Sequence, residues 1–282
     1  MTKRILILVL AAFLLNVAEL DASSFLTSLE AAKAEAKKKD QIIFVDLFAD
    51  WCGWCHRMKR EVFPSETFQN ATKNMVLLRV DTEDRGEGTQ LARAYKVRQL
   101  PTFLLIDADG LLAGSLYGYS PAEKFTKRLI AAYSDYEVFK ETLSRESTLG
   151  SDYPKRLAIA EEFLRRGGHE QGEQRLTALV SEPKVPHEIR DLSFYHLAAS
   201  QLARKEYAPA RETLQKFFSV QTSGDSLERA RLMMSQIYFE EGNYPKALAE
   251  LKGFKQKFPA SPLIEQVEAM LPQLESAVAR KN

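Results

Sequence analysis

Two cysteines close together in the sequence are the feature that most constrains this chain. Its 282 residues contain only Cys52 and Cys55, in the motif Trp51-Cys-Gly-Trp-Cys55. A pair at this spacing can be a redox-active disulfide, an inert structural bridge, half of a zinc site or, because His56 follows, a c-type haem attachment. With two cysteines, a scaffold held by several disulfides and a four-cysteine zinc site are both excluded.

The residues around the pair favour the redox disulfide. Before it, Gln41–Phe48 is nearly all apolar and rich in β-formers, as expected of a strand buried on both faces. After it, Met58, Val62 and Phe63 form an apolar face, and no proline or glycine interrupts residues 56–63, so a helix is predicted to open at the cysteines. Unpaired N–H groups and the positive dipole end of that helix would lower a thiol pKa. We therefore predict Cys52 as the attacking thiolate and Cys55 as the resolving thiol. No metal ion is predicted, and no cofactor besides their disulfide.

Alternating helix and strand patterns predict an α/β domain over residues 24–133. Its expected order is helix, strand, helix, strand, helix, strand, strand, helix. The last helix is signalled by Ser120-Pro-Ala-Glu123, which combines an N-cap, a proline at the first helical position and a capping-box glutamate. The expected segments are a first helix from Ser24 to Lys39, strands at Gln41–Phe48, Met75–Val80, Thr102–Ile106 and Leu111–Tyr117, and a last helix reaching about Tyr133.

Several of these segments resemble thioredoxin. The run Val45-Asp-Leu-Phe-Ala-Asp-Trp-Cys-Gly-Trp-Cys55 is similar to its active-site strand and turn, with Asp46 where that family keeps a buried carboxylate. Leu100-Pro-Thr102 resembles the family's cis-proline loop. With Glu61-Val-Phe63, the motif is similar to periplasmic thioredoxin-like domains, of which the C-terminal domain of the electron carrier DsbD is one. The resemblance covers roughly residues 25–133 and implies exchange of disulfides with protein substrates.

The resemblance also implies roles for particular residues. Asp46 would accept and return the proton of the resolving cysteine. Pro101 would shape a substrate groove, where the backbone beside Leu100 pairs with the substrate as an added strand. The further residues expected to contact substrate are Trp51, Gly53 and Trp54.

Two departures from the family pattern bear on the chemistry. Gly-Trp separates the cysteines, where reductants of the family usually have Gly-Pro. The lysine that pairs with the buried aspartate has no counterpart near Leu77, although Arg79 lies on the same strand face. The sequence therefore leaves open whether the protein acts as reductant, oxidant or isomerase.

Beyond about residue 134 the sequence repeats a helical pattern. A small residue is followed by apolar residues four and seven positions later, and the small residues are 38 and 37 positions apart. This is typical of an α-solenoid built from helix pairs, with a plain helical bundle as the alternative. The stretch Gly242–Leu251 resembles tetratricopeptide repeats most clearly. We predict a linker at 134–152 and repeats at 153–282. The three copies are Gly172/Leu176/Leu179, Ala210/Leu214/Phe217 and Ala247/Leu251/Phe254.

The first residues have the pattern of an export signal. Lys3 and Arg4 precede the apolar run Ile5–Leu15, which is too short for an ordinary membrane-spanning helix. We predict a signal peptide at residues 1–23 and a periplasmic location, with an uncleaved anchor or a buried first helix as alternatives. Export would place the cysteine pair in an oxidising compartment.

The charge composition limits the classes of partner that the protein is expected to bind. The sequence has 39 Lys and Arg residues and 38 Asp and Glu residues, which gives a net charge of +1. A nearly neutral chain is not expected to bind nucleic acid through electrostatic attraction. The sequence thus predicts an exported thiol–disulfide oxidoreductase whose helical repeats bind a protein partner, with a membrane redox partner as a further candidate. The competing hypothesis is a non-enzymatic interaction module with a vestigial cysteine pair.

Overall fold

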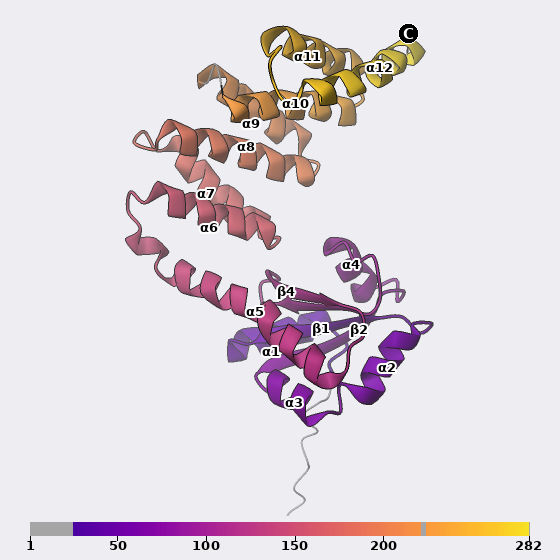
Figure 1. Ribbon diagram of the computed structural model, residues 1–282. Helices are drawn as coiled ribbons and strands as arrows, with labels where there is room; N and C mark the ends of the chain where they lie inside the picture. The colour runs from indigo at the N-terminus through magenta and orange to yellow at the C-terminus, as the bar shows by residue number, and fades with distance from the viewer. Residues whose placement is uncertain (1–24, 221–223, 282) are drawn as a thin grey trace, which may run out of the picture. The chain divides into compact units, whose positions relative to one another are not determined.

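The computed structural model describes residues 25–220 and 224–281 (Figure 1). The predicted signal peptide lies outside these residues. An α/β part comes first in the chain and a helical region follows it, which confirms the predicted fold class. The elements of the α/β part are α1 (Leu29–Lys39), β1 (Ile42–Phe48), α2 (Gly53–Glu61), α3 (Glu66–Thr72), β2 (Met75–Asp81), α4 (Glu87–Ala94), β3 (Thr102–Ile106), β4 (Leu112–Tyr117) and α5 (Ala122–Ser144).

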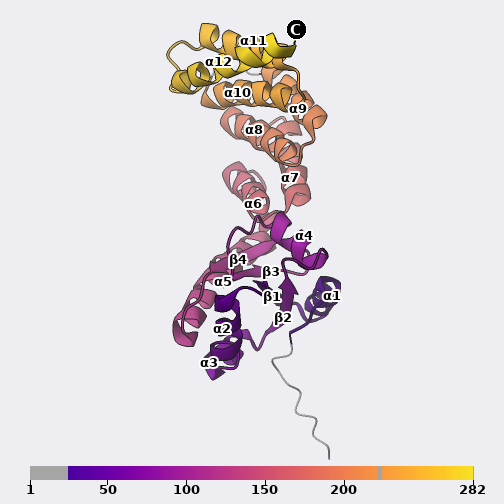
Figure 2. The same ribbon diagram turned by 90° about the vertical axis from the view of Figure 1, so that its right-hand side faces the viewer.

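The four strands form one sheet in the order β2-β1-β3-β4 (Figure 2). Strands β1 and β2 are parallel, and their register places Asp46 opposite Arg79. Strand β3 leads into β4 through a tight turn in which the N–H of Gly110 donates to the carbonyl of Asp107 at 3.1 Å. Beyond β2, Leu26 forms an isolated parallel bridge with Leu78.

Two expectations for the segments that precede β2 were wrong. The first helix starts at Leu29 with Ser28 as its N-cap, and Phe25 lies outside it because Leu26 is drawn into backbone pairing with β2. Two helices, not one, separate β1 from β2. Pro64 follows the end of α2, and Ser65 caps α3 by accepting a hydrogen bond from the N–H of Phe68 at 3.3 Å. The proline ends one helix and the N-cap starts another, so the predicted helix is followed by a second one that the expected order lacked.

A cluster of phenylalanine rings forms the core beside β1. The central ring is Phe44, which is completely buried. Edge-to-face and stacked contacts of this kind add about 0.5–1.5 kcal/mol per pair beyond the area they bury. The cluster therefore fixes β1, and with it the start of the cysteine motif. The rings within 6.3 Å of Phe44, centroid to centroid, are Phe25, Phe63, Phe68, Phe103 and Phe125.

Helix α5 runs well beyond its predicted end near Tyr133. Its second half buries Tyr136 and Phe139, and the Phe139 ring lies 5.2 Å from that of Phe163 in the next helix. These apolar residues continue the helical spacing, which is why the helix reaches Ser144. The predicted linker at 134–152 thus begins inside α5, and the domain boundary stays a prediction.

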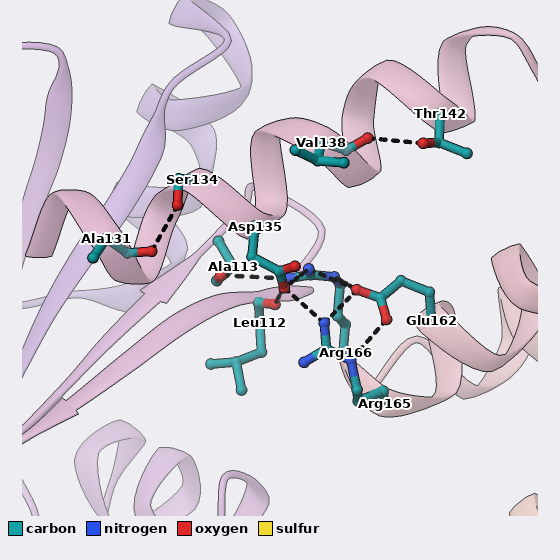
Figure 3. Close-up of polar contacts among 10 residues, drawn as sticks. All are labelled: Leu112, Ala113, Ala131, Ser134, Asp135, Val138, Thr142, Glu162, Arg165 and Arg166. Atoms are coloured by element: carbon teal, nitrogen blue, oxygen red, sulfur yellow. Dashed lines mark hydrogen bonds and ion pairs between the residues drawn. The ribbon is translucent and has the colours of Figure 1, made fainter.

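Arg166 joins strand β4 to the end of helix α6 (Tyr153–Arg165). Its guanidinium donates to the carbonyls of Leu112 and Ala113, at 2.7 and 3.3 Å (Figure 3). The backbone N–H of Leu112 in turn donates to the carbonyl of Arg166 at 2.9 Å. Asp135 and Glu162 complete the shell of this buried cation at 2.8 and 2.6 Å. Chain contacts accordingly group Leu104–Leu116 with the helical region as one compact unit.

The helical region continues as antiparallel neighbours along the chain (Figure 1). The small and apolar residues of the predicted repeat are buried in all three copies, as the spacing predicted. In the first copy a Cβ on Gly172 would come within 2.6 Å of a methyl of Leu164, so the helices cross closely there. The further elements are η1 (Glu146–Thr148), α7 (His169–Ser181), α8 (His187–Ala203), α9 (Tyr207–Val220), α10 (Asp225–Glu240), α11 (Tyr244–Lys257) and α12 (Ile264–Lys281).

Among the residues that the structure describes, none of the helices has the length and apolar character needed to cross a membrane.

Candidate active site

The two cysteines form a disulfide at the start of helix α2, directly after strand β1. Cys52 is the N-cap of the helix, and its Sγ accepts a hydrogen bond from the N–H of Cys55 at 3.2 Å. The S–S distance is 2.05 Å. Cys52 is 4% exposed and Cys55 0%, so the residue predicted to attack is the more exposed of the two. A sulfur at this position faces the helix N-terminus, which favours its thiolate form after reduction.

Asp46 lies in the middle of β1 and is completely buried. Its Oδ2 is 2.6 Å from Nη1 of Arg79, an ion pair in which neither carboxylate oxygen makes an aligned hydrogen bond to the described protein. Burial raises the pKa of Asp46 to about 7, and the opposing charge of Arg79 limits that rise. The guanidinium also lies over the ring of Phe48, 4.1 Å from its centroid. Arg79 therefore stands where the sequence suggested a partner for Asp46.

The loop before β3 has the conformation that the resemblance implies. The Leu100–Pro101 peptide bond is cis. Pro101 is buried, and its carbonyl accepts a hydrogen bond from the N–H of Gly118 at 2.9 Å, which ties the loop to the end of β4. Leu100 is half-buried, and Gly53 is exposed. The substrate contacts expected of these residues stay predictions.

Both tryptophans flank the disulfide and are exposed, Trp51 by 68% and Trp54 by 55%. The indole N–H of Trp51 donates to Oε1 of Glu83 at 2.9 Å. The Trp54 ring stacks on Tyr119, with centroids 5.4 Å apart and planes 24° from parallel. The positions of the two rings are thus set by residues that lie elsewhere in the chain.

Sequence reasoning missed the polar residues around Trp54. The hydroxyl of Tyr119 donates to Glu61 at 2.6 Å, and Nε of Arg57 donates to the same carboxylate at 2.9 Å. The guanidinium lies 4.5 Å from the Tyr119 centroid. Arg57 and Glu61 stand four apart on α2, which is a recognisable ion-pair spacing. Nothing in the sequence indicates that Tyr119 reaches them.

His56 occupies a structural position. Its Nε2 is 2.7 Å from the backbone carbonyl of Asp50, to which it can only donate. Within residues 25–220 and 224–281 no group of three or more histidine, cysteine or acidic side chains is placed to hold a metal ion.

Comparison with known proteins agrees with this geometry. The model of a thioredoxin-like domain matches residues 29–133, and that of the tetratricopeptide repeat matches 192–219 and 229–261. The thiol:disulfide interchange protein DsbD of Yersinia enterocolitica is 36% identical over 107 residues, which are 37% of this chain and 18% of that protein. DsbD of Klebsiella pneumoniae is 38% identical over 82 residues, 29% of this chain and 14% of that protein.

The chain thus spans less than a fifth of the length of these relatives. Among solved structures, the oxidised C-terminal domain of Neisseria meningitidis DsbD is 20% identical, with 39% of this chain and 99% of that domain covered and a TM-score of 0.34. With a cysteine pair at the head of a helix, a buried aspartate and a cis-proline loop, residues 29–133 are a thioredoxin-like domain, followed in the chain by tetratricopeptide repeats.

Proposed function

We propose that this protein is an exported thiol–disulfide oxidoreductase that exchanges disulfides with protein substrates through Cys52 and Cys55. The observation that carries the proposal is the Cys52–Cys55 disulfide at the N-terminus of α2, within a thioredoxin-like domain. The similarity to the thiol:disulfide interchange protein DsbD supports it.

In the reducing direction the steps balance as follows. A dithiol donor first reduces the protein's disulfide. The Cys52 thiolate then attacks a substrate disulfide, forming a mixed disulfide and releasing one substrate thiolate. The Cys55 thiolate next attacks Sγ of Cys52, which restores the protein disulfide and releases the second substrate thiol. The substrate gains two electrons and two protons, and the protein is oxidised. The oxidising direction is the reverse.

Asp46 would serve as the proton acceptor for Cys55 in this scheme. A pKa of about 7 lets its carboxyl both accept and release a proton near neutral pH, which suits a general base. The cis Leu100–Pro101 loop would shape the substrate groove, with backbone beside Leu100 pairing with the substrate chain.

Insulin reduction with dithiothreitol as electron donor tests the proposal. Wild-type protein should accelerate the reduction, and Cys52→Ser should fall to the rate of dithiothreitol alone. Cys55→Ser is the matched control: it should accumulate a mixed disulfide with insulin on a non-reducing gel, because only the resolving thiol is lost. Equal rates in wild type and Cys52→Ser would refute the enzyme. Under the competing scaffold hypothesis, partner binding would survive in a Cys52→Ser/Cys55→Ser double variant and no variant would affect insulin.

The helical region would supply partner choice. Tetratricopeptide repeats at 192–219 and 229–261 support binding of a protein partner, since solenoids of this kind present extended surfaces to proteins. A membrane-bound redox protein that reduces or oxidises the pair is a further partner that fits the proposed chemistry.

The proposal that the protein is exported depends on the sequence of residues 1–23. A fusion of these residues to alkaline phosphatase, which needs an oxidising compartment for its disulfides, should be active in a bacterial host. Replacing Leu10 and Leu14 by Arg should abolish that activity, because the apolar core of the signal is interrupted. Activity that survives the change would contradict export by this segment.

A further inference from the structure

The surface around the disulfide is aromatic. The two cysteines are nearly inaccessible, whereas the rings of Trp51 and Trp54 are more than half exposed on either side of Cys52. Tryptophan is enriched in the surfaces through which proteins bind one another, and above all among the residues that contribute most to binding. A substrate that reaches Sγ of Cys52 must therefore come close to these rings.

The Trp54 ring is held by a network that does not include the cysteines. Tyr119 stacks against the indole, the Tyr119 hydroxyl donates to Glu61, and Arg57 bonds to Glu61 while lying over the Tyr119 ring. The hydrogen bonds from Tyr119 and Arg57 hold the pKa of Glu61 below its usual value, which keeps the carboxylate charged. An aromatic ring fixed in this way loses little conformational freedom on binding.

The charges of the network neutralise one another. Arg57 and Glu61 form an ion pair at 2.9 Å, so their opposite charges offset each other beside Trp54. The guanidinium of Arg57 already occupies a cation–π position over Tyr119, the ring that supports Trp54. A second cation, from a substrate, would therefore gain little from that ring. What Trp54 offers a substrate is therefore apolar ring area.

We propose that Trp54, positioned by Tyr119 through Glu61 and Arg57, makes the protein select polypeptide disulfides whose cysteine is flanked by an apolar or aromatic side chain. The selection rests on the proposed disulfide exchange and deepens it. Tyr119, Glu61 and Arg57 act as positioning residues, and Trp54 is the specificity-determining contact.

Two synthetic disulfide-bridged peptides, identical except for Phe or Gln next to the attacked cysteine, test this selection. Pre-reduced protein is mixed with each peptide under steady supply of dithiothreitol, and kcat and KM are measured. Wild type should favour the Phe peptide by about fivefold in kcat/KM, mostly through KM, the size expected of one aromatic contact. The ratio between peptides cancels any general change in thiol reactivity.

Variants locate the effect. The ratio should drop to about one in Trp54→Ala, stay near the wild-type value in Trp54→Phe, and fall by about half in Tyr119→Phe, which keeps the ring but loses the bond to Glu61. Phe239→Ala, which removes an exposed ring on α10, is the matched control and should keep the full ratio.

A wild-type ratio of one, or a full ratio in Trp54→Ala, would overturn the selection. A full ratio in Tyr119→Phe would overturn the positioning role. If wild-type protein reduced neither peptide faster than Cys52→Ser does, the proposed disulfide exchange itself would be refuted.

Discussion

The carboxyl group of Asp46 is enclosed by the sheet with one partner. Away from the solvent the charged form is costly, so burial raises the pKa of Asp46 to about 7 from 3.8. Arg79 offsets part of that cost from 2.6 Å on the neighbouring strand. Between about pH 4 and pH 7, Asp46 therefore keeps its proton in the folded protein, whereas the same carboxyl has lost it in the unfolded chain.

This difference makes stability depend on pH. Because the folded state binds the extra proton, the free energy of unfolding should fall as pH rises from about 4 to 7 and level off above. Between pH 5 and 8 the fall should be on the order of 3 kcal/mol. Urea titrations followed by circular dichroism would measure it. In Asp46→Asn the fall should vanish, because a neutral amide stays neutral.

Asp50→Asn is the matched control for this experiment. It removes an exposed carboxyl four residues later, and its titrations should keep the wild-type slope. An unchanged slope in Asp46→Asn would show that the buried group does not titrate in this range. Arg79→Met should extend the fall above pH 7, since the charge that limits the pKa of Asp46 is gone.

At the scale of elements, helix α4 packs against the end of β2 through a glycine. A Cβ on Gly88 would lie 1.9 Å from the backbone carbonyl oxygen of Asp81, which cannot move without shifting the strand. Gly253 in α11 has nothing within 4 Å of the same position. Both glycines lie inside helices, so one substitution separates packing from helix propensity.

Gly88→Ala should lower the free energy of unfolding by about 2–3 kcal/mol, the cost of forcing a carbon into filled space. Gly253→Ala should raise it by about 0.5–1 kcal/mol, because alanine is the better helix former. Urea denaturation of each variant provides the measurement. The packing explanation fails if the two changes have the same sign.

Much of the architecture could be predicted because it depends on local patterns. The strand before the cysteines, the helix they open and the repeat positions are all signalled within one or two turns of chain. Cys52 at the N-cap and Asp46 in the core follow from those patterns together with the thioredoxin resemblance. The start of α3 is also signalled locally, by Pro64 and the N-cap Ser65, although the expected order did not include this helix.

Contacts between distant segments could not be predicted in this way. Tyr119 reaches Glu61 across 58 residues, and Arg166 reaches Leu112 across 54. An exposed tyrosine and a helix-end arginine have many uses, so the residue types carry no pairing signal. The extension of α5 belongs here too, because Phe139 is stabilised in the helix by Phe163 from the next one.

At the scale of the molecule, Arg166 links strand β4 with the helical region. It is 2% exposed, and five of its contacts are to backbone or acidic oxygens (Figure 3). Its neighbour Arg165 shares Asp135 and Glu162 but is 59% exposed. The same charge thus occurs twice in succession, once buried and once in water.

Arg166→Met should cost about 3 kcal/mol of unfolding free energy, because the carbonyls of Leu112 and Ala113 lose their donor in a buried place. Arg165→Met should cost less than about 1 kcal/mol, as exposed ion pairs do. Thermal unfolding followed by circular dichroism distinguishes the two. Equal losses would mean that the link is no more than a surface ion pair.

The backbone contacts of Leu26 and Arg166 also bear on how copies of this protein behave together. Leu26 covers the outer side of β2, with hydrogen bonds to the carbonyl of Leu77 and the N–H of Arg79, both at 2.8 Å. Arg166 covers the outer side of β4 at Leu112. Bare sheet edges are templates on which other chains aggregate. Both edges are blunted here by the chain itself, so a copy that lost its helical region would expose β4 to edge-to-edge aggregation.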